Sequence, residues 1–354
     1  MLRYQKLRQV LPSETDALLT MQGLNRSWLT GFNGSVGMVV TGREHRPVLL
    51  TDFRYTQQAT VQTPDYQVIQ TGGDSLADLL NVLQQQSIKC LGFEKDFITF
   101  AQYQSLQSKL EGVELVPLED IILNLRSIKD EGEIELLSQA VAIADQAYTH
   151  ILGFLRPGLT ERQVALELEH FMQGLGADGA SFEIIVASGP RSSLPHGVAT
   201  DRVLGKNEFV KMDFGCRYQG YCSDMTRTVV LGRADEKQRE VYKIVLAAQE
   251  AAIGGIRAGI TGKEADALAR ELITARGYGE MFGHGLGHGI GKAVHELPGV
   301  GSQSEKILPV GSVVTVEPGI YIPQWGGVRI EDMVVVQEGG CRILTKSSKE
   351  LVEL

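Results

Sequence analysis

The sequence predicts an α+β fold in two domains, an α/β layer over residues 1–126 followed by a duplicated helix and sheet domain over residues 127–354. Three observations support this prediction. The chain has 354 residues, more than the ~250–300 at which a single core stops growing. Strand-like and helix-like segments alternate near its start. A motif near residue 156 recurs 101 residues later.

The first domain is predicted from a series of short apolar runs. VGMVVTG, PVLLTD, CLGFEK and VELVPLE are bounded by turn residues, as strands are, whereas SLADLLNVLQQQS has apolar residues at helical spacing. This alternation is typical of an α/β layer. A charged segment then begins near Ser127 and continues with apolar residues three and four apart to about Leu155, which places the domain boundary before it.

The second domain contains an internal repeat. RPGLTERQ begins at Arg156 and RAGITGKE at Arg257, and in each a threonine, Thr160 or Thr261, precedes Gln or Glu by three residues. This spacing predicts a capping box, in which the two side chains satisfy open donors in the first turn of a helix. A long helical stretch precedes each motif and glycine-punctuated strands follow it. The domain is therefore predicted to be two copies of one helix-helix-sheet unit.

Composition restricts the range of partners. The net charge is −9 and no run of five basic residues occurs, which argues against binding to nucleic acid. No apolar run approaches the ~18 residues of a membrane span, and the first residues lack the apolar core of a signal peptide. We expect a cytoplasmic protein with a small-molecule partner and no membrane association.

The segment FVKMDFGCRYQGYCSDMTRTVVLG predicts a hairpin that carries two aspartates. With Tyr218 and Gln219 at the centre of the turn, Asp213 lies directly opposite Asp224. The side chains of directly opposite residues are close neighbours, and two ionised carboxylates in these positions repel each other unless a cation lies between them.

The segment VVTVEPGIYIPQWGGVRIEDMVVV repeats this arrangement, because a turn centred on Gln324 places Glu317 opposite Glu331. A single strand carboxylate most often faces solvent. These carboxylates instead lie in apolar, β-branched runs whose two faces should both be buried. Burying unpaired carboxylates costs several kcal/mol, so four of them predict compensation by two divalent cations.

Histidines complete the candidate site. The segment Phe282–Gly299, FGHGLGHGIGKAVHELPG, holds three of the seven histidines, and its glycines let the backbone approach a metal closely. We expect one ligand there and two histidines for proton transfer or substrate contact. His196, in a Pro/Gly loop, is a further candidate that spacing alone leaves open, whereas His45, His150 and His170 are scattered. The loop lacks the Lys-Ser/Thr ending of a phosphate-binding P-loop.

In order and flanking residues, these motifs resemble the dinuclear "pita-bread" metallopeptidases of family M24, which include methionine aminopeptidase, aminopeptidase P and prolidase. NRSWLTGFNGSVG and LLTDFRYTQQA resemble the amino-terminal domain of the proline-directed branch, so the resemblance covers the whole chain. It implies a creatinase-like α/β amino-terminal domain and a pita-bread catalytic domain with an internal pseudo-twofold duplication.

The resemblance also implies a cofactor and a reaction. Two divalent metal ions would be held by Asp213, Asp224, His288, Glu317 and Glu331. An oxygen-rich site of this kind favours Mn2+, with Co2+, Fe2+ or Zn2+ as alternatives. A hydroxide bridging the two metals would hydrolyse the Xaa-Pro bond at the amino end of peptides.

Roles for the surrounding side chains follow from the same resemblance. The catalytic residues would be His196, His295 and Glu317. The substrate-binding residues would be His196, His284, His295, Tyr321 and Arg329. The partners would be proline-containing peptides or dipeptides, and the protein would be a homodimer.

Several alternatives stay open within and beyond this family. Methionine aminopeptidase has a similar sequence around the counterpart of His288. It lacks a counterpart of residues 1–125, however, and the glutamates that correspond to Glu317 and Glu331 are spaced more widely in it. Spacing does not separate an Xaa-Pro dipeptidase from an Xaa-Pro aminopeptidase. A metal-free pita-bread binding protein is the alternative of a different class, although such relatives have lost ligands that are complete here.

Overall fold

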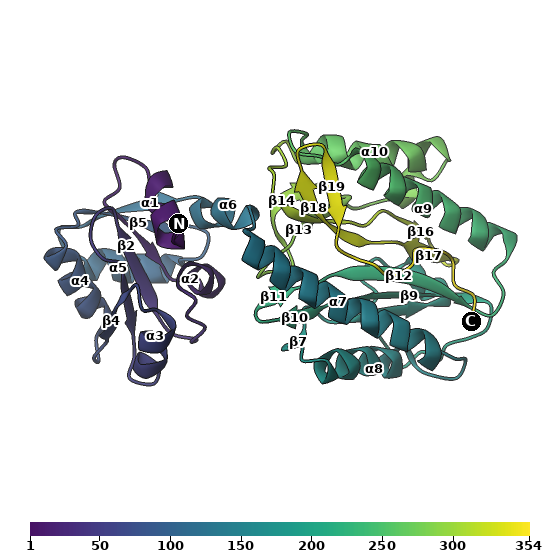
Figure 1. Ribbon diagram of the computed structural model, residues 1–354, viewed down its shortest axis with the longest axis horizontal. Coiled ribbons are helices and arrows are strands. Elements are labelled where there is room, and N and C mark those ends of the chain that lie inside the picture. The colour runs from purple at the N-terminus through teal and green to yellow at the C-terminus, as the bar shows by residue number, and fades with distance from the viewer. The chain divides into compact units, whose positions relative to one another are not determined.

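The computed structural model describes all 354 residues. The chain forms two compact units, residues 1–126 and 127–354, and each is described by itself (Figure 1). No helix combines the length and the apolar character that crossing a membrane requires.

The first unit is a six-stranded mixed sheet, in the order β4-β3-β2-β1-β5-β6, with helices packed against it. Its strands are β1 (Ala17–Thr20), β2 (Met38–Gly42), β3 (Val48–Thr51), β4 (Gln67–Gln70), β5 (Cys90–Glu94) and β6 (Glu114–Leu118). Its helices are α1 (Arg3–Val10), α2 (Gly23–Thr30), α3 (Thr56–Gln62), α4 (Ser75–Gln85), α5 (Phe100–Lys109) and α6 (Ile121–Ser127). The four predicted strands and the predicted helix are confirmed as β2, β3, β5, β6 and α4. The strands β1 and β4 were not predicted.

The second unit consists of two similar halves. Its helices are α7 (Glu131–Phe154), α8 (Glu161–Gly174), α9 (Glu236–Gly255) and α10 (Gly262–Ala275), with short 3-10 helices η1 (Gly189–Ser193) and η2 (Gly279–Met281). The strands of the first half are β7 (Gly179–Ala180), β8 (Ile185–Ser188), β9 (Glu208–Phe214), β10 (Cys216–Tyr218), β11 (Tyr221–Cys222) and β12 (Met225–Leu231). Those of the second half are β13 (Gly287–Gly289), β14 (Glu296–Val300), β15 (Val313–Val316), β16 (Gly319–Ile322), β17 (Gly326–Arg329), β18 (Asp332–Gln337) and β19 (Gly340–Ile343).

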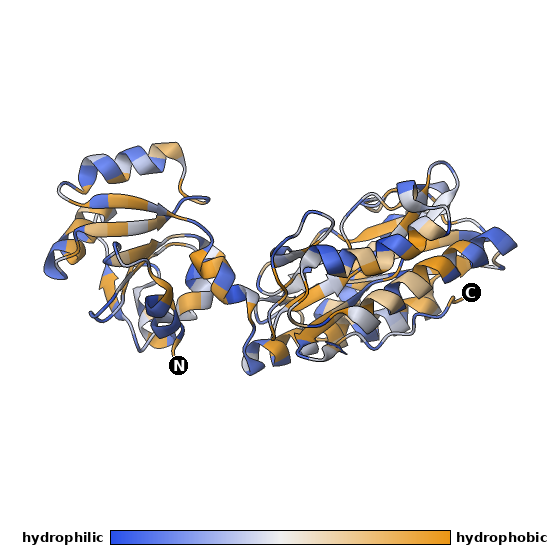
Figure 2. Ribbon diagram, turned by 90° about the horizontal axis from the view of Figure 1, so that it is seen from above, coloured by the Kyte–Doolittle hydropathy of each residue, from blue (hydrophilic) through white to orange (hydrophobic).

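Each half of this unit packs a helix pair on a sheet. Apolar residues of α7 and α8 form one core with β8, β9 and β12, and those of α9 and α10 form another with β15 to β18. The two helix pairs therefore lie on opposite sides of the strands (Figure 1). The strands between them are mostly apolar (Figure 2), so their faces form the cores on which the helix pairs pack.

The predicted repeat is confirmed in the helices. Helices α8 and α10 begin 101 residues apart, and both capping boxes are formed. The Thr160 hydroxyl accepts a hydrogen bond from the Gln163 amide at 3.2 Å, and the Thr261 hydroxyl accepts one from the Glu264 amide at 3.1 Å. The same local signal thus starts the second helix of each half.

The predicted register of the second hairpin is confirmed. Gly319 pairs with Arg329 in the β16–β17 ladder, and Val316 pairs with Asp332 in the β15–β18 ladder. Glu317 and Glu331 therefore face each other in the short gap between the two ladders.

The predicted register of the first hairpin is wrong by two residues. Asp213 pairs with Thr226 rather than with Asp224. The centre of the turn is Gln219–Gly220, where both residues have positive φ (48° and 78°), as a type I′ turn requires. Because side chains alternate with a period of two, this shift leaves Asp224 on the same face as Asp213, as a diagonal neighbour.

We expect Thr261→Ala to lower the free energy of unfolding of the second unit by about 1 kcal/mol, because the substitution removes the hydroxyl of a capping box. Urea unfolding followed by circular dichroism measures this change. Thr149→Ala is the control, since this threonine is exposed, lies within α7 away from its first turn and bonds the carbonyl of Asp145. Equal destabilisation by the two substitutions would contradict the capping role.

Candidate metal centre

The five residues predicted to hold metal lie around one cavity of about 400 Å³ in the second unit. Each of them lies near a strand end or in the gap between two strands. They are Asp213 in β9, Asp224 before β12, His288 in β13, Glu317 between β15 and β16, and Glu331 between β17 and β18. The cavity is also lined by four of the other predicted residues, His196, His284, His295 and Arg329. Tyr321 is not among the lining residues.

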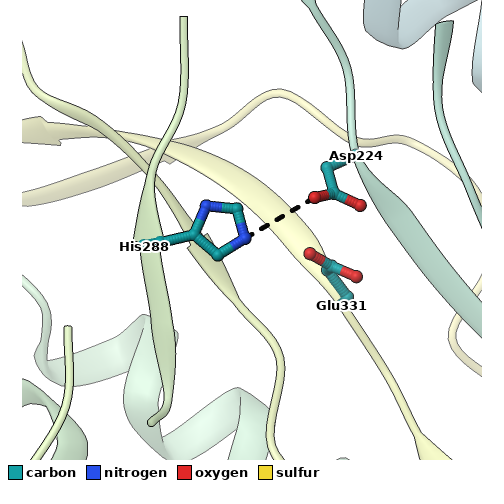
Figure 3. Close-up of side chains that lie close together, drawn as sticks. All are labelled: Asp224, His288 and Glu331. Atoms are coloured by element: carbon teal, nitrogen blue, oxygen red, sulfur yellow. Dashed lines mark ion pairs between the residues drawn. The ribbon is translucent and has the colours of Figure 1, made fainter. Parts of the chain in front are cut away.

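Three of the five side chains form one mutually close group. Ligand atoms of Asp224, His288 and Glu331 all lie within 4.8 Å of one another. Figure 3 shows the two carboxylates side by side, facing the imidazole, with Asp224 and Glu331 coming from different segments of the chain. The Nε2 atom of His288 lies 3.6 Å from Asp224 Oδ2 and 3.4 Å from Glu317 Oε1. A cation placed between these atoms would meet both nitrogen and oxygen donors.

The glycines beside His288 are required by the close approach of neighbouring strands. A Cβ atom on Gly287 would lie 2.1 Å from the carbonyl oxygen of Thr315, and one on Gly289 would lie 2.3 Å from that of Leu297. Any side chain at either position would therefore push β13 out of place. The glycine-rich sequence allows this short strand to carry His288 between β14 and β15.

One cation, Arg329, is built into the cluster of four carboxylates. Its side chain is only 3% exposed. Its guanidinium forms an ion pair with Asp213, and its Nε lies 3.9 Å from Glu317 Oε2. A single positive charge cannot neutralise four carboxylates, so the cluster keeps an excess of negative charge whenever all four are ionised.

The pKa values of the carboxylates reflect this excess of negative charge. Burial raises the pKa of Glu317 to about 7. Burial, together with the neighbouring carboxylates, raises the pKa values of Asp224 and Glu331 well above their usual range. Without added cations, protonation is thus the way for the cluster to reduce its repulsion.

The donor set fits divalent cations. The Oδ1 atom of Asp213 and the Oε1 atom of Glu331 are buried and have no hydrogen-bond partner. Buried polar atoms are otherwise almost always paired, because an unpaired one costs free energy. Hard carboxylate oxygens with one imidazole are suitable ligands for such ions, and two doubly charged cations would offset four carboxylates.

Two threonines orient the carboxylates, and the sequence analysis missed both. The hydroxyl of Thr226 donates to Glu331 Oε2 at 2.7 Å, and that of Thr315 donates to Glu317 Oε1 at 3.1 Å. Thr226 also accepts a hydrogen bond from Arg329 Nε at 2.8 Å. Thr226 follows Asp224 by two residues and Thr315 precedes Glu317 by two. The two-residue period of a strand was therefore the signal that could have found them.

Tyr321 lies behind the cavity wall and is hydrogen-bonded to two residues that line the cavity, His284 and Arg329. Arg329 Nη1 donates to the Tyr321 hydroxyl at 3.1 Å, and this hydroxyl lies 2.8 Å from His284 Nε2. Burial lowers the pKa of His284 to about 4, so its ring is neutral. The tyrosine therefore donates to Nε2, while Nδ1 donates to the carbonyl of Gly285 at 2.8 Å. Both ring nitrogens are engaged, which leaves only the carbon edge of His284 for a ligand.

His196 and His295 lie at the open side of the cavity, where both are exposed. The ring of His295 is centred 4.1 Å from that of His288. Apolar side chains form another part of the wall, namely Phe182, Ile185, Val198 and Val294. The cavity thus combines polar side chains that can contact a ligand with an apolar wall that can seat a hydrophobic ring.

Comparisons with known proteins agree with this architecture. Residues 135–338 match the profile described as metallopeptidase family M24, and residues 3–128 match that of the creatinase/prolidase N-terminal domain. An Xaa-Pro dipeptidase of Pyrococcus horikoshii is 44% identical over 267 residues, which cover 75% of this chain and 76% of that protein.

Solved structures extend the similarity over the whole chain. An Xaa-Pro dipeptidase from Bacillus anthracis has a TM-score of 0.97 at 45% identity and covers 99% of each chain. An X-Pro aminopeptidase from Thermotoga maritima has a TM-score of 0.93 at 38% identity and covers 99% of this chain and 100% of its own. The fold predicted from the sequence, with a creatinase-like domain before a pita-bread domain, is confirmed.

We expect the metal-free protein to lose stability as the pH rises from about 5 to 7.5. Glu317 releases its proton near pH 4.5 in the unfolded chain but near 7 in the folded one. The folded state therefore holds more protons between these values, and its stability falls by at most about 1.4 kcal/mol per pH unit for this group. Thermal unfolding in chelator at pH 5.5 and 7.5 measures the fall in Tm.

Glu317→Gln cannot titrate and should show a smaller fall in Tm over the same interval. Glu183→Gln is the matched control, because Glu183 is an exposed carboxylate that lines the same cavity. If Glu317→Gln kept the full pH dependence of the unsubstituted protein, the raised pKa of Glu317 would be refuted.

Proposed function

The chain belongs to metallopeptidase family M24, and from this membership we propose that it hydrolyses the Xaa-Pro bond at the amino end of small peptides, with Xaa-Pro dipeptides as its main substrates. One observation carries the proposal. Four carboxylates and His288 gather around one cavity, with only Arg329 to offset their charge and with two buried carboxylate oxygens left unpaired. Such an arrangement suits divalent cations and little else.

Five side chains would hold two divalent ions, with Mn2+ as the first choice among them: Asp213, Asp224, His288, Glu317 and Glu331. When bound, the ions would polarise the scissile carbonyl and make a nucleophilic water available at neutral pH. Arg329, Thr226 and Thr315 would keep the carboxylates in place through the contacts described above.

Proton transfer falls to Glu317 and the histidines at the open side. A carboxylate oxygen of Glu317 would accept a proton from the attacking water and pass it towards the leaving proline nitrogen. His295 and His196 would contact the peptide near the scissile bond and assist this transfer. Tyr321, which lies behind the wall, would hold His284 and Arg329 in place rather than contact the substrate.

The choice of substrate rests on two further observations. A cavity of about 400 Å³ lies within the ~300–1,000 Å³ range of small-molecule sites, and its apolar wall suits a pyrrolidine ring. The Xaa-Pro dipeptidase of Bacillus anthracis resembles this chain over 99% of its length. A homodimer stays a prediction from the family resemblance.

We expect Asp224→Asn to lower bound metal per chain and to reduce kcat/KM by at least about 100-fold, because it removes one charged ligand from between His288 and Glu331. Metal analysis of gently purified protein and a peptidase assay measure the two effects. Glu183→Gln, at the rim of the same cavity, should change neither. Full metal content in Asp224→Asn would remove this residue from the ligand set.

The substrate is tested by comparing Ala-Pro, Ala-Pro-Gly and Ala-Ala after addition of Mn2+. We expect rapid release of alanine from Ala-Pro, slower release from Ala-Pro-Gly and none from Ala-Ala, because the apolar wall is proposed to select proline. Amino-acid analysis of the products measures all three. Faster cleavage of the tripeptide would instead favour an Xaa-Pro aminopeptidase, and cleavage of Ala-Ala alone would refute proline specificity.

A further inference from the structure

A buried ion pair lies directly behind one of the cavity histidines. Lys129 Nζ lies 2.9 Å from Glu296 Oε1, and the two side chains are only 1% and 3% exposed. Burying two charges costs desolvation free energy that their attraction barely repays. A pair so deeply buried therefore contributes little to stability compared with two apolar side chains, and another role would account for it better.

The lysine end of the pair is fixed by its backbone. The Lys129 amide donates to the carbonyl of Gly311 at 3.0 Å, and the Gly311 amide donates to the carbonyl of Val336 at the end of β18. Asp130, the next residue, caps helix α7. Lys129 is thus tied both to a helix and to the sheet that carries Glu331.

The glutamate end fills a space that a glycine leaves open. A Cβ atom on Gly291 would lie 2.0 Å from Glu296 Oε1 and 3.1 Å from Lys129 Cε. The carbonyl of Gly291 accepts a hydrogen bond from the Cys222 amide at 2.8 Å, two residues before Asp224. The loop from Gly291 to Glu296 is therefore held at both ends, at Gly291 by the Cys222 amide and at Glu296 by Lys129. The Glu296 carboxylate packs over Gly291.

The position of His295 depends on how the two ends of this loop are held. His295 lies in the bend just before β14 and Glu296 is the first residue of the strand, and their side chains have opposite surroundings, since that of Glu296 is 3% exposed whereas His295 is exposed to solvent. With Glu296 held inward by Lys129, His295 points outward, where it lines the cavity beside His288. Releasing Glu296 would free the loop to rotate and would move the imidazole.

We propose that the buried Lys129–Glu296 pair, packed over Gly291, positions His295 for its contact with the substrate. The inference rests on the proposed function, in which His295 contacts the peptide. Lys129 and Glu296 are positioning residues, since neither one lines the cavity.

Two substitutions break the pair in different ways. Lys129→Met removes the charge, whereas Gly291→Ala leaves every charge in place and displaces the carboxylate by steric overlap. Each should reduce kcat/KM by about 10- to 100-fold, the scale of a displacement of roughly 1 Å in an active site, with metal content per chain unchanged. Lys263→Met is the control, because Lys263 forms a pair of the same 2.9 Å length with Glu305 on the surface and should have no effect.

The decisive measurement combines each substitution with His295→Ala. If the pair acts through His295, neither substitution reduces kcat/KM further in the His295→Ala background. Multiplied losses would overturn the proposal, because they would show that the pair acts elsewhere. Gly291→Ala decides the matter should Lys129→Met fail to fold.

Hydrogen exchange in the metal-free protein separates this proposal from the proposed function. Amides of residues 292–297 should exchange faster in Gly291→Ala than in the unsubstituted protein, whatever the enzyme cleaves. Unchanged exchange would overturn the positioning role. Faster exchange, combined with full activity of His295→Ala, would support the structural link and refute instead the assignment of His295 to substrate contact.

Discussion

The repulsion among four carboxylates gathered in one cavity is the constraint on which the rest of the second unit depends. Asp213, Asp224 and Glu331 are buried and Glu317 is half-buried, near strand ends and in the gaps between strands. A protein gains nothing in stability from such an arrangement unless cations compensate it. The fold must therefore hold these groups together against their own charge, and the strands, glycines and threonines around them do so.

Duplication provides a frame for this cluster. The first half contributes Asp213 and Asp224, and the second half contributes His288, Glu317 and Glu331. The two halves are joined beside these residues, since the Glu331 amide donates to the carbonyl of Thr226 at 3.1 Å and the Thr228 hydroxyl donates to that of Arg329 at 3.0 Å. The candidate metal centre thus lies where the halves meet, and neither half could form it alone.

The sequence predicted most of this because its strongest signals are periodic or repeated. Two capping boxes 101 residues apart located the duplicated helices. The assumed turn centre of each hairpin located the paired carboxylates. One hairpin was misplaced by two residues, because the type I′ turn at Gln219–Gly220 was not recognised. Contacts that join distant segments, such as Lys129 with Glu296, have no period. The sequence does not distinguish a buried lysine from a solvated one, so contacts of this kind could be found only in the structure.

These contacts share one feature, which is that a long basic side chain supports the backbone or loop of three of the four cavity histidines, His196, His284 and His295. The carbonyl of Pro195, beside His196, accepts hydrogen bonds from Arg329 at 3.1 Å and from Lys211 at 3.3 Å. Arg270 donates to the carbonyl of His284 at 2.6 Å, and the Lys129–Glu296 pair holds the loop of His295. Each of these side chains has its own compensation, since burial lowers the pKa of the Lys211 amine well below its usual range, whereas Arg270 is paired with Asp266 and Lys129 with Glu296. The histidines are therefore positioned through backbone carbonyls and loops that basic side chains hold in place, and the geometry of the site depends on residues outside its donor set.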